Sequence, residues 1–184
     1  MNKCIYCLGD SNTFGYDPRS PLGDRYPEHW CELLQKALSC PVICDGLNGR
    51  SIGDVLRAYD ILRTALLKQQ PSELVVLLGT NDILMEGLSE PAAVAERMNA
   101  LLGRLREDFP EMPIFLLSPP EIRIPGFLQW ASSLSGHYQS LSQRYGTRFL
   151  SLASLSLPLS FDGVHLTEEG HLQLARILAA FFKS

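Results

Sequence analysis

Residue types that together make a nucleophilic catalyst occur near both ends of this 184-residue chain. Ser11 stands in the polar stretch GDSNTFG, and the stretch DGVH places Asp162 and His165 three residues apart. A serine hydroxyl attacks efficiently when a histidine takes its proton, and the histidine needs a third group that fixes its tautomer. We therefore expect Ser11 to be the nucleophile, His165 the general base and Asp162 the group that orients His165.

Two further polar stretches contain groups that could stabilise a negatively charged oxygen. When a carbonyl is attacked, its oxygen becomes an oxyanion, which needs rigid N–H donors. DGLNGRS contains Gly49, whose missing Cβ suits close approach of the backbone to a ligand, and GTND contains Asn81. We expect the backbone amides of Ser11 and Gly49 and the side chain of Asn81 to form an oxyanion hole, with Gly46 as the rival of Gly49.

These polar stretches follow apolar runs that are typical of buried parallel strands. The runs are continuous rather than alternating, which indicates strands covered on both faces. They span residues 4–9, 41–44, 73–79, 113–118 and 148–152. In parallel sheets, ligands bind beyond the carboxyl ends of the strands, so the pattern predicts one site built from loops that are distant in sequence.

Segments with helical periodicity lie between the apolar runs. Their apolar stripes fall within residues 30–38, 55–66, 94–105, 134–145 and 174–182, and Thr167 is the expected N-cap of the last helix. Strands that alternate with helices form a parallel sheet with right-handed crossovers. The predicted fold class is α/β, a three-layer α/β/α sandwich around a flavodoxin-like five-stranded parallel sheet. The suggested strand order is 2-1-3-4-5, in a single domain over residues 1–184.

Composition and charge narrow the range of partners. The net charge is −4, from 16 Lys and Arg against 20 Asp and Glu, and no basic cluster occurs, so nucleic acid is not an expected partner. No apolar stretch approaches the roughly 18 to 20 residues that span a bilayer. The apolar run at the N-terminus is too short for a signal sequence. We expect a cytoplasmic protein that does not insert into membranes.

The five cysteines do not have the spacing of a disulfide framework. CIYC is formally a C-x-x-C motif, but residues i and i+3 of a strand point to opposite faces and cannot chelate one ion. A redox motif of this kind would begin a helix instead. We therefore predict buried strand cysteines at Cys4 and Cys7, and no metal.

The stretches GDSNTFG, GLNGRS, GTND and DGVH together resemble the four sequence blocks of the SGNH (GDSL-type) hydrolases, in the same order and over nearly the whole chain. The resemblance implies a three-layer α/β/α fold and the hydrolysis of acyl esters with no metal or cofactor. It also implies that Ser11 is the nucleophile, His165 the base and Asp162 its partner. Gly49 and Asn81 would join the Ser11 amide in the oxyanion hole. SPPEIRIPGF and DGVHLTEEGH are similar to the arylesterase/acyltransferase branch.

We therefore expect a serine esterase that hydrolyses small carboxylic esters, acetyl or other acyl esters, through an acyl-enzyme intermediate. Its partner is then a small-molecule ester. A carbohydrate acetylesterase and a lysophospholipase are alternatives within the same family. The predicted substrate pocket contains Asn12, Ile122, Ile124, Phe127 and Val164. The apolar loop in this region could serve instead as a contact between copies of the chain. A homo-oligomer is therefore a further possible partner arrangement.

Other classes of protein share parts of this pattern. SNTFG after the first strand resembles the phosphate loop of flavodoxins, which would make the chain an FMN-binding electron carrier with no need for Asp162 and His165. GDS and GTND superficially resemble metallophosphoesterase blocks, but the metal-binding histidines of those blocks are missing. A non-catalytic binder of a small ligand or carbohydrate would need a broken triad, and all three residues are present.

The remaining polar residues near the motifs have structural interpretations. We expect Asp10 to brace its loop by accepting hydrogen bonds from backbone N–H groups, and Asp82 to cap the segment that follows it. Among the histidines, we expect His171 at the edge of the core or on the surface. His29 and His137 are expected to be exposed to solvent.

Overall fold

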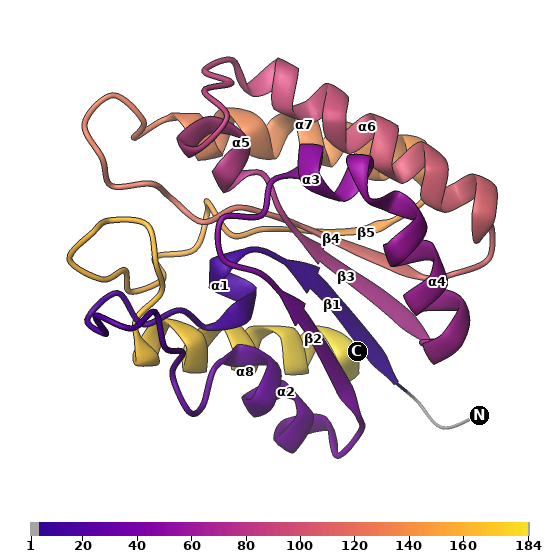
Figure 1. Cartoon of the computed structure of the whole chain (residues 1–184), viewed down its shortest axis with the longest axis horizontal. Coiled ribbons are helices and arrows are strands. Elements are labelled where there is room, and N and C mark those ends of the chain that lie inside the picture. Colours follow the sequence, from indigo (N-terminus) through magenta and orange to yellow (C-terminus); the bar gives the residue numbers. More distant parts are fainter. Residues whose placement is uncertain (1–3, 184) are drawn as a thin grey trace.

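A computed structural model describes residues 4–183, and its centre is a parallel sheet of five strands in the order β2-β1-β3-β4-β5 (Figure 1). The strands are β1 (Ile5–Gly9), β2 (Val42–Gly46), β3 (Glu73–Leu77), β4 (Ile114–Ser118) and β5 (Arg148–Ser151). Every pairing between neighbours is parallel. The α/β fold and the strand order 2-1-3-4-5 are thereby confirmed, whereas a single domain over residues 1–184 stays a prediction.

Helices cover both faces of the sheet (Figure 1). One face carries α2 (Trp30–Leu38) and α8 (Glu168–Lys183), which pack against each other. The other face carries α3 (Ile52–Arg57), α4 (Tyr59–Gln69), α6 (Pro91–Asp108) and α7 (Trp130–Tyr145). Two short helices, α1 (Ser11–Phe14) and α5 (Thr80–Leu84), begin just after β1 and β3. Each face of the sheet has its own apolar core, so the three predicted layers are present.

Burial along the elements follows the periodicity of the sequence, with one difference. β1, β3 and β4 are buried along their whole length, whereas β2 and β5 at the edges are partly exposed. The stripe expected over residues 55–66 is divided at Ala58, whose backbone (φ −109°, ψ 28°) leaves the helical region while its amide still bonds to the Asp54 carbonyl. The last helix begins as predicted, because Thr167 Oγ1 accepts a hydrogen bond from the Gly170 amide at 3.1 Å.

The register of the sheet brings the polar stretches to one edge. Gly9, the last residue of β1, pairs with Gly46 at the end of β2 and with Leu77 at the end of β3. The segments that follow these three strands therefore leave the sheet side by side. A site built from them lies at this carboxyl edge, as expected for parallel sheets.

All five cysteines are free thiols. Cys7 is buried on β1 as predicted, but Cys4 lies just before the strand and is only half-buried, because the chain has not yet entered the sheet there. Between residues 4 and 183, no helix has the combination of length and apolar character that crossing a membrane requires.

Candidate active site

Ser11 and His165, which are 154 residues apart in sequence, meet at the carboxyl edge of the sheet. Ser11 Oγ lies 2.9 Å from His165 Nε2, and His165 Nδ1 lies 2.6 Å from Asp162 Oδ2. The structure thus brings together the three residues that the sequence predicts for nucleophilic chemistry. A hydroxyl, an imidazole and a carboxylate connected in this way can transfer a proton from the hydroxyl to the ring.

The turn that carries Asp162 and His165 is held by its own hydrogen bonds. Asp162 Oδ1 accepts from the backbone amides of Val164 and His165, at 3.0 and 3.1 Å, while Oδ2 faces the imidazole. Burial favours the neutral acid, but the hydrogen bonds from His165 and from the two amides outweigh it and lower the pKa of Asp162. The carboxylate therefore accepts from Nδ1 and leaves Nε2 to receive the proton of Ser11.

Asn12 joins the Ser11 turn to the His165 turn. Its Nδ2 donates to the Val164 carbonyl at 3.2 Å, and its Oδ1 accepts from the Leu166 amide at 2.9 Å. Only 2% of its surface is exposed, and both ends of its amide are used on the backbone. We predicted Asn12 as part of the substrate pocket, but its contacts are those of a clamp that keeps the two turns together.

The four other residues predicted for the substrate pocket belong to or border the core. Ile122 and Val164 are buried in the core between the sheet and α6 and α7. Ile124 and Phe127 are half-buried and pack against the same core. That these side chains line a substrate pocket stays a prediction.

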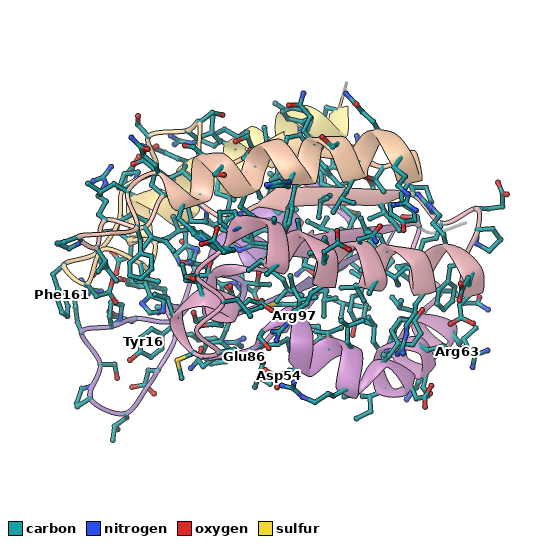
Figure 2. The ribbon with its side chains drawn as sticks, turned by 90° about the horizontal axis from the view of Figure 1, so that it is seen from above. Tyr16, Asp54, Arg63, Glu86, Arg97 and Phe161 are labelled. Atoms are coloured by element: carbon teal, nitrogen blue, oxygen red, sulfur yellow. The ribbon has the colours of Figure 1, made fainter. Side chains whose placement is uncertain are left out.

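Two aromatic residues that the sequence analysis did not single out, Tyr16 and Phe161, stand next to the motifs of Ser11 and His165 in the sequence. The ring of Tyr16 packs on the imidazole of His165, with ring centroids 4.7 Å apart. Phe161, the residue before Asp162, is 80% exposed. Figure 2 shows Tyr16 and Phe161 at the same end of the molecule. Their positions immediately after GDSNTFG and before DGVH are the signal that could have identified them.

The groups predicted for the oxyanion hole have N–H protons available. Within residues 4–183, the backbone amides of Ser11 and Gly49 have no hydrogen-bond partner. Asn81 lies in α5 and donates from Nδ2 to the Arg50 carbonyl at 3.0 Å. Because an amide nitrogen carries two protons, a second one remains for a ligand.

Glycine is required for different structural reasons at the two glycine positions of DGLNGRS. A Cβ on Gly46 would lie 2.1 Å from the amide nitrogen of Phe14, so Gly46 allows α1 to pack closely on β2. Gly49 has φ +76°, and nothing lies within 4 Å of a Cβ placed there. Its left-handed backbone, rather than lack of space, therefore requires glycine. The unpaired amide belongs to Gly49, which favours it over Gly46 as the donor.

Arg50 fastens the loop that carries Gly49 to the ends of two strands. Its Nη1 donates to the carbonyl oxygens of Gly9 and Asp45, at 3.1 and 2.6 Å. Its Nη2 forms an ion pair with Asp45 Oδ1 at 2.8 Å. The guanidinium group thus satisfies backbone acceptors at the carboxyl ends of β1 and β2. It thereby holds the loop that carries the Gly49 amide in place against these two strands.

Asp82 holds the other end of this loop. Its Oδ2 accepts from the Ile52 amide at 2.9 Å, and its Oδ1 pairs with Arg97 at 2.8 Å. Arg97 also pairs with Glu86, which bonds to Ser51 Oγ, and Figure 2 shows Glu86 and Arg97 beside each other. The prediction that Asp82 caps the segment after it is wrong, because it caps α3, which precedes it by 30 residues.

Asp10 braces the Ser11 turn, as predicted. Its Oδ1 accepts from the Asn12 amide at 2.9 Å, and the side chain is 1% exposed. Burial raises the pKa of Asp10 to about 7, helped by the charge of Asp82 and opposed by the hydrogen bond from Asn12. The folded protein therefore holds a proton on Asp10 at pH values where the unfolded chain does not.

Asp10→Asn should change how stability depends on pH. In the wild type, the stability linked to Asp10 is fully present below about pH 4 and is lost as the pH rises to about 7, because the pKa is higher in the folded state. Asparagine keeps the acceptor for the Asn12 amide and does not titrate. Relative to the variant, the wild type should lose up to about 4 kcal/mol of unfolding free energy over this range. Urea unfolding at pH 4, 5.5 and 8 measures the difference, and parallel curves for the two proteins would contradict it.

In the part of the chain that the structure describes, His165 is the histidine that meets Ser11 Oγ, and the other three have different surroundings. His137 is exposed, as predicted. The prediction that His171 lies at the edge of the core or on the surface is wrong, because its exposed fraction is 0%, and burial lowers its pKa to about 3 and keeps it neutral. The prediction that His29 is solvated is wrong, because its exposed fraction is 0%. It packs on Gly15, where a Cβ would lie 2.4 Å from the His29 Cβ. This contact depends on the tertiary fold, and no local sequence pattern predicts it.

The fold, a parallel sheet covered by helices on both faces, is that of a family of ester hydrolases. The chain belongs to the GDSL-like lipase/acylhydrolase family, whose model matches residues 7–172. This match confirms the resemblance to SGNH hydrolases and the prediction of a carboxylic ester hydrolase. It also selects the hydrolase over the flavin-binding electron carrier.

Solved structures of esterases are similar to this chain over almost its full length. A putative arylesterase from Agrobacterium tumefaciens has 27% sequence identity and a TM-score of 0.82, with 98% of each chain covered. A carbohydrate acetylesterase family member from Sinorhizobium meliloti has 25% identity and a TM-score of 0.81, over 98% of this chain and 97% of that one. The M. smegmatis aryl esterase, at 24% identity, shares the fold with a TM-score of 0.82 over 98% of each chain. No curated protein sequence matches significantly.

Proposed function

We propose that the chain is a serine esterase that hydrolyses small carboxylic esters through an acyl-enzyme intermediate. The observation that carries the proposal is the continuous hydrogen-bonded path from Ser11 Oγ through His165 to Asp162, at 2.9 and 2.6 Å. Family membership supplies the class of reaction. The path supports Ser11 as the nucleophile because the imidazole is in position to take its proton.

In the first half of the reaction, Ser11 Oγ attacks the carbonyl carbon of the ester while its proton moves to His165 Nε2. The Asp162 carboxylate stabilises the resulting imidazolium. The negative charge that forms on the carbonyl oxygen is stabilised by the amides of Ser11 and Gly49 and by Asn81 Nδ2. When the tetrahedral intermediate collapses, the bond to the alcohol breaks and His165 gives its proton to the leaving oxygen.

In the second half, the acyl group leaves Ser11. A water molecule loses a proton to His165 and attacks the acyl carbon, and the same three donors stabilise the second oxyanion. Collapse of this intermediate returns the proton to Ser11 Oγ and releases the carboxylic acid. No other group is needed for the proton balance, because His165 acts as base and acid in turn.

Small esters suit the surroundings of Ser11. Only residues 85–90 connect α5 to α6, so little chain covers the site on that side. The ring of Tyr16 offers apolar contact beside His165, which fits a short acyl group or an aryl alcohol, and the exposed Phe161 lies at the same end of the molecule. An acetylated carbohydrate is the second candidate, supported by the similar acetylesterase from Sinorhizobium meliloti.

A fluorophosphonate probe tests the nucleophile directly. We expect covalent labelling of the folded protein at a single residue, Ser11, and loss of labelling after heat denaturation. Peptide mapping by mass spectrometry identifies the residue. Hydrolysis of p-nitrophenyl esters from acetyl to palmitoyl, and of acetylated oligosaccharides, then defines the substrate. Labelling of any other serine, or none, would overturn the assignment of Ser11.

Asn81→Ala should lower kcat for a small ester by about 10²- to 10³-fold, because it removes one donor to the oxyanion. KM should change much less, since the interaction forms in the transition state. Steady-state hydrolysis of p-nitrophenyl acetate measures both constants. Asn48→Ala is the matched control, because Asn48 is exposed in the loop before Gly49. An unchanged kcat in Asn81→Ala would remove Asn81 from the oxyanion hole.

A further inference from the structure

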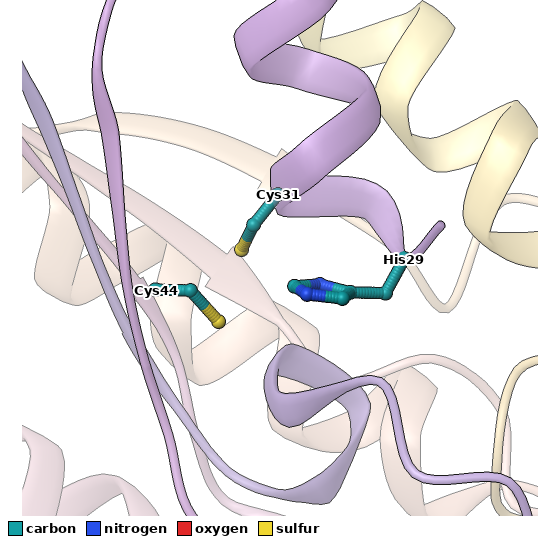
Figure 3. A group of neighbouring side chains, drawn as sticks. All are labelled: His29, Cys31 and Cys44. Atoms are coloured by element: carbon teal, nitrogen blue, oxygen red, sulfur yellow. The ribbon is translucent and has the colours of Figure 1, made fainter. Parts of the chain in front are cut away.

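A buried group of soft ligands lies beneath the helix that begins with Ser11. His29 immediately precedes α2, Cys31 lies in the first turn of α2, and Cys44 lies on β2 at the edge of the sheet. One imidazole nitrogen and the two sulfur atoms lie within 4.8 Å of one another. Figure 3 shows the three side chains converging from α2 and β2. These are not the cysteines of the CIYC motif that the sequence analysis considered for a metal.

The burial of the polar His29 side chain is not explained by contacts within the protein alone. This side chain is fully buried, and neither ring nitrogen has a hydrogen-bond partner among the residues that the structure describes. A buried polar group without a partner costs about 1–3 kcal/mol, so such groups usually have a ligand, an ion or a water. A metal ion bound by the imidazole would satisfy one nitrogen of His29.

The two thiols already share one oxygen acceptor. Cys44 Sγ lies 3.2 Å and Cys31 Sγ 3.9 Å from the carbonyl oxygen of Thr13, a residue of α1. The group therefore offers two sulfurs, one nitrogen and one carbonyl oxygen. Four donors of this mixed kind fit a tetrahedral ion that accepts sulfur, nitrogen and oxygen ligands, which is the behaviour of Zn²⁺.

Size and charge also favour Zn²⁺. Zn–S bonds of about 2.3 Å and Zn–N bonds of about 2.0 Å place tetrahedral ligands roughly 3.5–3.8 Å apart, so the donors would need to close by about 1 Å. Two thiolates and one divalent ion sum to zero charge, which suits a buried site, whereas a monovalent ion would leave a net negative charge there. Cys44 is half-buried on the edge strand and provides a route for the ion from solvent.

We propose that His29, Cys31 and Cys44 form a zinc-binding site, with the Thr13 carbonyl as the fourth ligand. The site is separate from the Ser11–His165–Asp162 group, and its existence does not depend on the proposed esterase mechanism. Binding releases the two thiol protons and replaces the hydrogen bonds to Thr13 by coordination. Zinc would then hold α1, α2 and β2 to one another.

Metal binding by the reduced, full-length protein tests the site. We expect equilibrium dialysis to show one Zn²⁺ per chain with a dissociation constant below about 1 µM, and Zn²⁺ to raise the melting temperature. Co²⁺ should give the intense near-ultraviolet absorption of sulfur-to-metal charge transfer. Cys44→Ser and His29→Gln should each weaken Zn²⁺ binding by about 10²-fold or more.

Matched variants decide between the proposed ligands and other thiols. Cys4→Ser is the control for Cys44, because both thiols are half-buried, and it should bind Zn²⁺ like the wild type. Cys7 pairs with Cys44 in the sheet, and retained affinity in Cys7→Ser supports Thr13 as the fourth ligand. Cys44 is near solvent, so Cys44→Ser remains informative if His29→Gln does not fold. No binding by the wild type, unchanged binding in Cys44→Ser, or loss of binding in Cys4→Ser or Cys7→Ser would overturn the proposed ligand set.

Discussion

Ser11→Ala is expected to lower kcat for p-nitrophenyl acetate by about 10⁴- to 10⁶-fold. The variant keeps the imidazole, the carboxylate and the oxyanion donors, but it has no oxygen to form the acyl-enzyme. The remaining turnover should come from water positioned by His165 and from the oxyanion hole. Steady-state rates corrected for spontaneous hydrolysis measure the loss, together with the disappearance of fluorophosphonate labelling.

The loss must be separated from unfolding. The Ser11 side chain is small, and its hydroxyl bonds to His165 rather than to the core, so alanine should leave the circular dichroism spectrum and the unfolding midpoint nearly unchanged. Ser140→Ala is a suitable control, because Ser140 is an exposed serine on α7. A Ser11→Ala variant that is folded and keeps kcat within tenfold of the wild type would exclude Ser11 as the nucleophile.

The parts of the fold that follow from local pattern were predictable from the sequence. Continuous apolar runs locate all five strands to within about two residues, and the same runs imply helices on both faces. The polar stretches after β1, β2 and β3 indicate the edge where a site forms, since parallel strands end at the same edge. The structure agrees with this expectation, because Gly9 at the end of β1 pairs with Gly46 at the end of β2 and with Leu77 at the end of β3.

Contacts between segments that are distant in sequence were not predictable in the same way. The Asp82 side chain could have capped its own helix, and nothing local indicates that it binds the Ile52 amide instead. The burial of His29 depends on α1 lying against the start of α2, and the clamp role of Asn12 depends on the His165 turn arriving beside it. Such roles depend on tertiary packing, which a sequence pattern does not specify.

These distant contacts give the candidate site its rigidity. Arg50 fixes one end of the Gly49 loop to β1 and β2, and Asp82 fixes the other end through Ile52. Asn12 connects the Ser11 turn to the His165 turn. An oxyanion hole is effective when its donors are held in place before the charge develops, because no reorganisation is then needed. The buried polar residues around the site thus hold the proposed donors in place.

Asp162→Asn is expected to lower kcat by about 10⁴-fold while leaving the fold intact. Asp162 Oδ1 accepts from two backbone amides, and an asparagine Oδ1 would keep both of these bonds. The NH₂ group of the asparagine must then face His165 Nδ1, where the wild type has the carboxylate oxygen Oδ2. Because NH₂ only donates, Nδ1 loses its proton and Nε2 gains one, so the imidazole points an N–H at Ser11 and cannot act as base.

The test of this tautomer argument compares kcat for p-nitrophenyl acetate and the rate of fluorophosphonate labelling in Asp162→Asn and in Asp24→Asn. Asp24 is an exposed carboxylate that bonds to Ser20, so its amide variant shows the effect of removing one negative charge alone. Both rates should fall together in Asp162→Asn, because each needs His165 to accept the Ser11 proton, and neither should fall in Asp24→Asn. If Asp162→Asn keeps kcat within tenfold of the wild type, the orientation of His165 does not depend on this carboxylate, and the base must be held by other contacts such as the ring of Tyr16.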